Sequence, residues 1–164
     1  MPRLRPALLV VTALAVAFAV TACSIGGPGG STTVSITHGA VTPTSTVPGG
    51  PDGVGTLRTF HAAVTVDGGG SGYFDATMTT TSVDTAAGTE TRITKIVFTL
   101  NQGVDQLILE GSAVYPATGS TIKVAATVSR PVIGGSGAYA GARDWAESTR
   151  LADGTWSHVF HLQP

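Results

Sequence analysis

The chain has 164 residues, of which 42% are hydrophobic and 12% charged, and its formal net charge is −1. This length fits one folded domain, and the near-neutral charge gives no support for nucleic-acid binding through a basic surface. A single cysteine excludes an internal disulfide. The 22 glycines, with frequent threonine and valine, favour β-strands joined by tight turns.

The first residues have the pattern of a secretory signal peptide. Arg3 and Arg5 give it a positive start, and an apolar run over residues 7–20 follows. This run is shorter than the roughly 20 residues that a membrane-spanning helix needs, and it fits the apolar centre of a signal peptide. We therefore predict a signal peptide over residues 1–22.

The apolar run leads directly into Val20-Thr21-Ala22-Cys23, which resembles the bacterial lipobox. The resemblance implies cleavage after Ala22 and lipidation of Cys23 by acyl chains such as palmitate, so that this thiol is not catalytic. Acyl chains contribute about 0.8 kcal/mol per buried CH₂, so several together anchor a protein stably. The alternative is an ordinary signal peptide with an incidental cysteine. We predict a lipoprotein on the extracytoplasmic face of the cell membrane, with the membrane as its partner.

Residues 23–55 are rich in Gly, Pro, Ser and Thr and contain few apolar side chains. Such a segment cannot bury enough apolar surface to offset its conformational entropy. We predict a flexible linker from the lipidated cysteine to Gly55, with a short strand around Val34 and Ile36 as the alternative.

Residues 56–164 are predicted to form the folded domain. Apolar and polar residues alternate over 120–129, which is a strand signal, and Pro131 bends the chain after it. Asp153-Gly154 is typical of a hairpin turn. Regular turn spacing favours a closed antiparallel barrel or a sandwich. The predicted strands span residues 56–66, 72–84, 89–100, 105–115, 120–129, 142–150 and 155–162.

The glycine-rich run over residues 132–143 has two interpretations. In the first, residues 138–152 form an amphipathic helix. Gly135-x-Gly137-x-x-Ala140 would then precede a helix and match, loosely, the glycine motif of dinucleotide-binding proteins. That motif requires a strand–helix–strand unit and an acidic residue about 20 positions later. Because the sequence continues for only one more predicted strand, we favour a tight structural turn and expect no cofactor.

From about residue 96 to 162 the order of features resembles the allene oxide cyclase and dirigent barrel superfamily. Gly119-Ser120-Thr121-Ile122 is similar to a turn of that family. The family's glycine-rich motif is matched by Gly134, Gly135, Gly137, Tyr139, Gly141 and Arg143, for which the resemblance implies a structural role. It also implies an all-β fold, an eight-stranded antiparallel β-barrel with a central cavity.

Two positions depart from the family pattern. Ser136 replaces the usual threonine, and Asp144 stands where the family usually has glycine, which puts the local backbone in question. Plant members of the superfamily cyclise an epoxide or guide radical coupling. An isomerase or cyclase is therefore one function that the resemblance implies.

Candidates for chemistry follow from strand alternation, because alternate residues of a barrel strand face inward. A carboxylate inside an apolar cavity has a raised pKa and can act as acid or base. Glu110 and Glu147 are the candidate catalytic carboxylates, with His158 and His61 as possible partners. No metal site is predicted, since His158 and His161 are three apart and point to opposite faces of a strand.

Aromatic side chains are the candidates for ligand contact. Tyr115 shares a strand face with apolar residues, and Trp145 and Trp156 lie on neighbouring predicted strands. Cross-strand packing of the two tryptophans is the alternative to a ligand platform.

Three functions are compatible with these features: a module that binds a small apolar ligand, an isomerase or cyclase, and a structural or interaction protein of the cell envelope. Only 6% of residues are aromatic and many are small, which leaves little bulk to fill a wide barrel. We therefore predict a cavity and rank ligand binding first.

Overall fold

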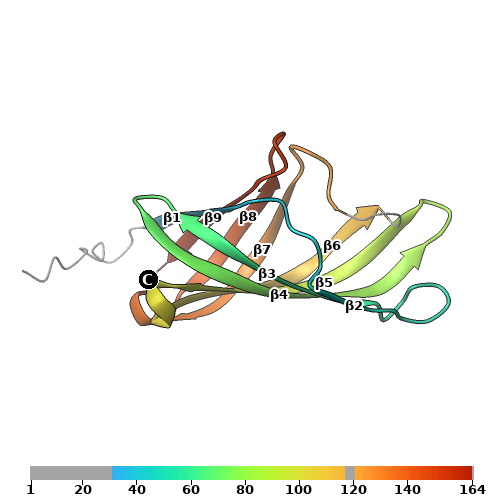
Figure 1. Ribbon diagram of the computed structural model, residues 1–164, viewed down its shortest axis with the longest axis horizontal. Helices are drawn as coiled ribbons and strands as arrows, with labels where there is room; N and C mark the ends of the chain where they lie inside the picture. The colour runs from blue at the N-terminus through green and yellow to red at the C-terminus, as the bar shows by residue number, and fades with distance from the viewer. Residues whose placement is uncertain (1–30, 117–120, 164) are drawn as a thin grey trace, which may run out of the picture.

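The computed structural model describes residues 31–116 and 121–163, and Figure 1 shows their long strands curving around a common interior. The predicted signal peptide, its predicted cleavage site at Ala22 and the predicted lipidation site at Cys23 lie outside the described residues. Within the described ranges, no helix is long and apolar enough to cross a membrane. The strands are β1 (Thr32–His38), β2 (Ser45–Val47), β3 (Leu57–Val66), β4 (Gly70–Asp84), β5 (Thr89–Leu100), β6 (Asp105–Pro116), β7 (Thr127–Ser136), β8 (Arg143–Arg150) and β9 (Trp156–Gln163).

All strand pairings are antiparallel, and the sheet closes on itself. The order is β1-β9-β8-β7-β6-β5-β4-β3-β2, and β1 also pairs with β3 through Ile36 and Thr37. The short β2 pairs with the other end of the same β3 edge, opposite Leu57–Thr59. β1 and β2 thus share one position of the ring, which confirms the predicted eight-stranded barrel.

The barrel begins earlier than the sequence predicted. β1 lies within the segment predicted as a flexible linker, and all seven of its residues pair with β9 from Leu162 to Trp156. Ile36 is fully buried. The polar composition of β1 gives it little tendency to form a strand on its own. In the barrel it is stabilised because it closes the sheet and buries one of its faces. This long-range pairing explains why local composition indicated a linker.

The strand after β6 is also displaced from its predicted position. The alternating residues 121–126 form a turn, in which Ala125 has a φ of 63° and its N–H donates to the carbonyl of Arg150. β7 starts only at Thr127 and continues through Pro131. Pro131 precedes Val132, where the pairing of β7 with β6 begins, so its missing N–H interrupts no bond of that ladder.

Aromatic and aliphatic side chains fill one end of the barrel. Phe98 and Phe160 are fully buried and meet edge to face, with ring centroids 5.4 Å apart. Leu107 and Leu109 on β6 are also fully buried. At the other end β4, β5 and β6 extend beyond the shorter β8 and β9, as Figure 1 shows.

The glycine-rich motif forms the end of β7 and the turn into β8. A short 3₁₀ turn, η2 (Gly137–Tyr139), takes the place of the alternative helix. The Ala138 N–H donates to Asp105 Oδ1 at 2.8 Å, which ties this turn to the start of β6. Asp144 has a φ of 113°, a backbone region that favours the glycine usual in the family.

Two neighbouring glycines of this motif should respond differently to a methyl group. A Cβ at Gly135 would collide with the Tyr139 carbonyl and lie 2.7 Å from the Gln106 carbonyl, whereas a Cβ at Gly134 would meet nothing within 4 Å. We expect Gly135→Ala to lower the free energy of unfolding by about 1–3 kcal/mol, because backbone must move to relieve the overpacking. Gly134→Ala is the control and should change it by less than about 1 kcal/mol. Urea denaturation of both variants measures the difference, and equal losses would contradict the close packing at Gly135.

Candidate ligand-binding site

A cavity of about 270 Å³ lies inside the barrel, toward the end where β4 to β6 extend. Two interruptions of the sheet border it. β6 pairs with β7 only from Gln106 to Leu109, so the end of β6 that carries Tyr115 leaves the ladder. Between β1 and β2 the chain crosses as an irregular segment, and residues 41–43 of that segment line the cavity.

One wall of the cavity is apolar. It is formed by inward-facing side chains of β3, β4, β5 and β9, namely Phe60, Phe74, Ala76, Met78, Ile96 and Trp156. On β4, Phe74 and Ala76 alternate with exposed residues, as barrel geometry requires. The wall offers apolar and aromatic surface for a small ligand.

The interior next to this wall, toward the turn between β4 and β5, is charged. Arg92 on β5 is 1% exposed and donates through Nη2 to Oε1 of Glu90 on the same strand. Thr80 Oγ1 donates to Glu90 Oε2 at 2.8 Å, and Arg58 Nη2 lies 3.9 Å from Glu90 Oε1. Two guanidinium groups therefore share one buried carboxylate.

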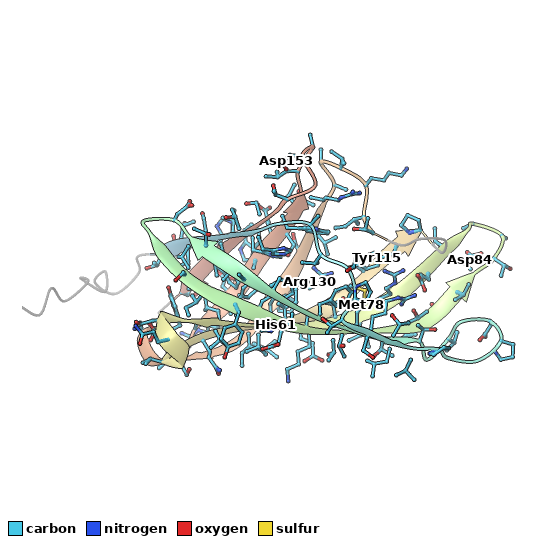
Figure 2. All side chains as sticks on the ribbon, viewed as in Figure 1. His61, Met78, Asp84, Tyr115, Arg130 and Asp153 are labelled. Atoms are coloured by element: carbon cyan, nitrogen blue, oxygen red, sulfur yellow. The ribbon has the colours of Figure 1, made fainter. Side chains whose placement is uncertain are left out.

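A second basic contact lies beside this cluster. Arg130 of β7 is 3% exposed, and its Nη2 donates to the hydroxyl of Tyr115 at 2.7 Å. The Arg92 guanidinium lies over the ring of Tyr115, 4.5 Å from its centroid, in cation–π geometry. Tyr115 thus connects the two arginines, and Figure 2 shows Tyr115 and Arg130 next to each other above Met78.

The site also contains two histidines. His158 is 2% exposed and pairs with Ser148 Oγ through Nδ1 at 2.9 Å, while its Nε2 has no hydrogen-bond partner among the described residues. The rings of His38 and His158 stack with centroids 5.1 Å apart, and His38 also lies against Phe74 at 4.6 Å. Ser148, His38 and His158 all line the cavity.

Burial and neighbouring charges set the ionisation of these groups. Burial lowers the pKa of His158 to about 3, helped by the nearby His38 and Arg130, and burial lowers the pKa of His38 as well. Burial alone would raise the pKa of Glu90, but hydrogen bonds from Arg92 and Thr80 lower it, and the charge of Arg58 adds to this. At neutral pH the histidines are uncharged and Glu90 is ionised.

The candidate carboxylates Glu110 and Glu147 do not line the cavity. Glu110 follows the fully buried Leu109 and lies opposite the exposed Lys95, on the outer face of β6. Glu147 lies on the outer face of β8, with its Oε2 3.9 Å from His161 Nε2. The structure therefore does not place either carboxylate in the desolvated position that an acid–base role would require.

The two candidate histidines lie on different faces of the sheet. His61 is exposed on the outer face of β3, where its Nδ1 lies 2.8 Å from Asp75 Oδ1. His158 faces the cavity. Within the parts of the chain described, no three His, Cys, Asp or Glu side chains come together as they would around a metal ion.

Two of the three aromatic candidates line the cavity. Tyr115 and Trp156 contribute to its wall. Trp145 lies on the outer face of β8 and stacks on His161, with ring centroids 3.9 Å apart. The two tryptophans therefore do not pack on each other; Trp145 pairs with His161 and Trp156 with Arg150 in the ladder.

Sequence reasoning missed the charged half of the cavity. Glu90 and Arg92 lie an even number of positions from the buried Ile96 and Phe98, so they face the same side of β5. This alternation could have indicated from the sequence that both side chains point inward. Charged residues at such positions are rarely buried unless they are paired. Arg130 carried no comparable signal, because its strand was predicted to end one residue earlier.

No family model matches the chain, and no curated protein sequence matches it. Among solved structures, a pyocyanin demethylase superposes with a TM-score of 0.57 at 18% identity, over 81% of this chain and 99% of that chain. A pterocarpan synthase dirigent protein superposes with a TM-score of 0.55 at 13% identity, over 90% and 96%. At these identities the likeness shows the fold. It confirms the predicted antiparallel β-barrel, a fold like that of the dirigent protein.

Proposed function

We propose that this protein is a lipid-anchored extracytoplasmic lipoprotein whose barrel binds a small, largely apolar ligand. The observation that carries the binding proposal is the interior cavity of about 270 Å³ with its wall of Phe60, Phe74 and Ile96. Ligand pockets are typically about 300–1,000 Å³, mostly apolar, with a few convergent polar groups. The volume favours a small ligand, and the polar end favours one with a polar group.

The anchor proposal is supported by the sequence around Cys23. β1 starts at Thr32, nine positions after Cys23, so the intervening chain can span at most about 30 Å. A lipidated Cys23 would hold the barrel close to the membrane surface. Cys23→Ala should abolish incorporation of labelled palmitate and move the protein from the membrane fraction. Unchanged labelling would contradict the anchor.

Binding is proposed ahead of catalysis because of the chemistry of the cavity. An isomerase or cyclase that uses a carboxylic acid needs a carboxyl group with a raised pKa facing the ligand. Glu110 and Glu147 face outward, and the pKa of the inward Glu90 is lowered. The cavity itself argues against a barrel that is filled throughout and serves a purely structural role.

The binding proposal is tested with the full-length protein in nanodiscs. The protein is incubated with a total lipid and metabolite extract and washed, and retained molecules are identified by mass spectrometry. Thr94→Phe should fill the cavity, since Thr94 lines it and is 2% exposed. Thr77→Phe is the matched control, on the outer face of the neighbouring strand.

We expect the wild type and Thr77→Phe to retain the same small molecule, and Thr94→Phe to lose at least about nine-tenths of it, a cost of about 1.4 kcal/mol or more. Circular dichroism establishes that both variants are folded. If nothing is retained above empty nanodiscs, or if folded Thr94→Phe retains as much as the wild type, binding in the cavity is contradicted.

A further inference from the structure

The charges inside the barrel do not balance. Three arginines line the cavity, Arg58, Arg92 and Arg130. In the described part of the chain Glu90 is the one acidic side chain that is buried. Buried charges are costly unless a charge of opposite sign and hydrogen bonds compensate them. Among the described residues that face the barrel interior, positive charges therefore outnumber negative ones.

Arg130 is the arginine of this set to which the described residues supply no carboxylate partner. Glu90 interacts with Arg92 and Arg58, but no described carboxylate lies within 4.0 Å of the Arg130 guanidinium. Its hydrogen bond to Tyr115 is to a neutral phenol, and its Nε has no acceptor among the residues described. An arginine has five N–H donors, so Arg130 retains donors for a ligand.

The position of Arg130 is also fixed before any ligand arrives. Its side-chain stem crosses Gly111 of β6 so closely that a Cβ there would lie 3.2 Å from Arg130 Cγ. The Tyr115 hydroxyl holds the guanidinium at its other end. A held guanidinium loses little conformational freedom on binding, and its planar fork matches the oxygens of a carboxylate or phosphate.

We infer that the ligand carries an anionic group, bound by Arg130 with the Tyr115 hydroxyl beside it. The inference rests on the proposed binding function and adds the chemical class of the ligand. The apolar body of such a molecule lies against Phe74 and Ile96, which line the same cavity. The ligand is a small apolar acid, with a carboxylate or a phosphate as its charged end.

Matched probes separate the charge from the apolar body. Full-length protein in nanodiscs is titrated with 1-naphthoate and 1-naphthamide, with decanoate and decanamide, and with 1-naphthyl phosphate. Empty nanodiscs correct for partitioning into lipid. The variants are Arg130→Gln, Tyr115→Phe and, as the control for the change in net charge, Lys95→Gln on the exposed outer face of β5.

We expect the acids to bind at least about tenfold more tightly than their amides, and Arg130→Gln to weaken acid binding about 10- to 100-fold. The same variant should leave the amides within about threefold, and Lys95→Gln should leave both classes unchanged. Tyr115→Phe should weaken the acids by a smaller factor. Whichever of carboxylate and phosphate binds more tightly identifies the anion.

Several outcomes would overturn the inference. If acids and amides bind equally, or if folded Arg130→Gln weakens both equally, the anionic group is wrong while the binding function stands. If no probe of either class binds although the extract yields a retained neutral molecule, the inference also fails alone. If neither the probes nor the extract yield binding, the inference and the proposed function fail together.

Discussion

Glu90→Gln is expected to lower the free energy of unfolding by about 3–5 kcal/mol. The substitution keeps the shape of the side chain but removes the carboxylate that Arg92 and Thr80 contact and that lies near Arg58. Removal of one partner from a buried ion pair leaves an uncompensated charge, which typically costs this much. Urea denaturation at pH 7 measures the loss.

Glu147→Gln provides the matched control on the outer face of β8. Glu147 lies 3.9 Å from His161 at a partly exposed site, where an ion pair contributes about 0–1 kcal/mol. We expect a change of that size or less. A loss in Glu90→Gln no larger than in Glu147→Gln would show that Glu90 does not compensate the interior arginines.

Acid should destabilise the barrel through His158 before the carboxylates titrate. The pKa of His158 is lowered to about 3 by burial, whereas an unfolded chain has an ordinary histidine pKa of about 6.5. Above pH 6.5 the group is neutral in both states. As the pH falls below that value only the unfolded state takes up the proton, so the free energy of unfolding falls by up to about 1.4 kcal/mol per pH unit.

The variant His158→Phe isolates this effect, because it keeps an aromatic ring and removes the proton site. The pKa of His38 is also lowered and contributes a slope of the same sign, so the comparison is between wild type and variant. From pH 6.5 to 5 the wild type should lose up to about 2 kcal/mol more than His158→Phe. Equal slopes in wild type and His158→Phe would contradict a buried, neutral His158.

The fold could be predicted where local signals and the barrel agree. Alternation placed Leu107, Leu109 and Tyr115 on one face of a strand, and all three face the interior. Asp153-Gly154 correctly marked the turn between β8 and β9. In these strands, the side chains that the alternating pattern predicts to face inward are the ones buried by the closed sheet.

The same signals failed where pairing is long-range. Apart from Val34 and Ile36, β1 consists of polar residues in a Gly- and Pro-rich setting, and its stability comes from β9, more than 100 positions later in the chain. The interior charges are also brought together from different strands. Arg58 and Glu90 lie 32 positions apart, and Tyr115 and Arg130 lie 15 apart. No local pattern specifies such neighbours.

The most direct test of the ligand-binding barrel is a crystal structure of the protein grown with 1-naphthoate. We predict electron density for the ligand inside the barrel, with its ring against Phe74 and Ile96 and its carboxylate within hydrogen-bond distance of Arg130. Density for the ligand at that place with the carboxylate elsewhere would support the cavity and contradict the role of Arg130. A barrel interior closed by side chains, with 1-naphthoate absent or bound only on the outer surface, would contradict the account.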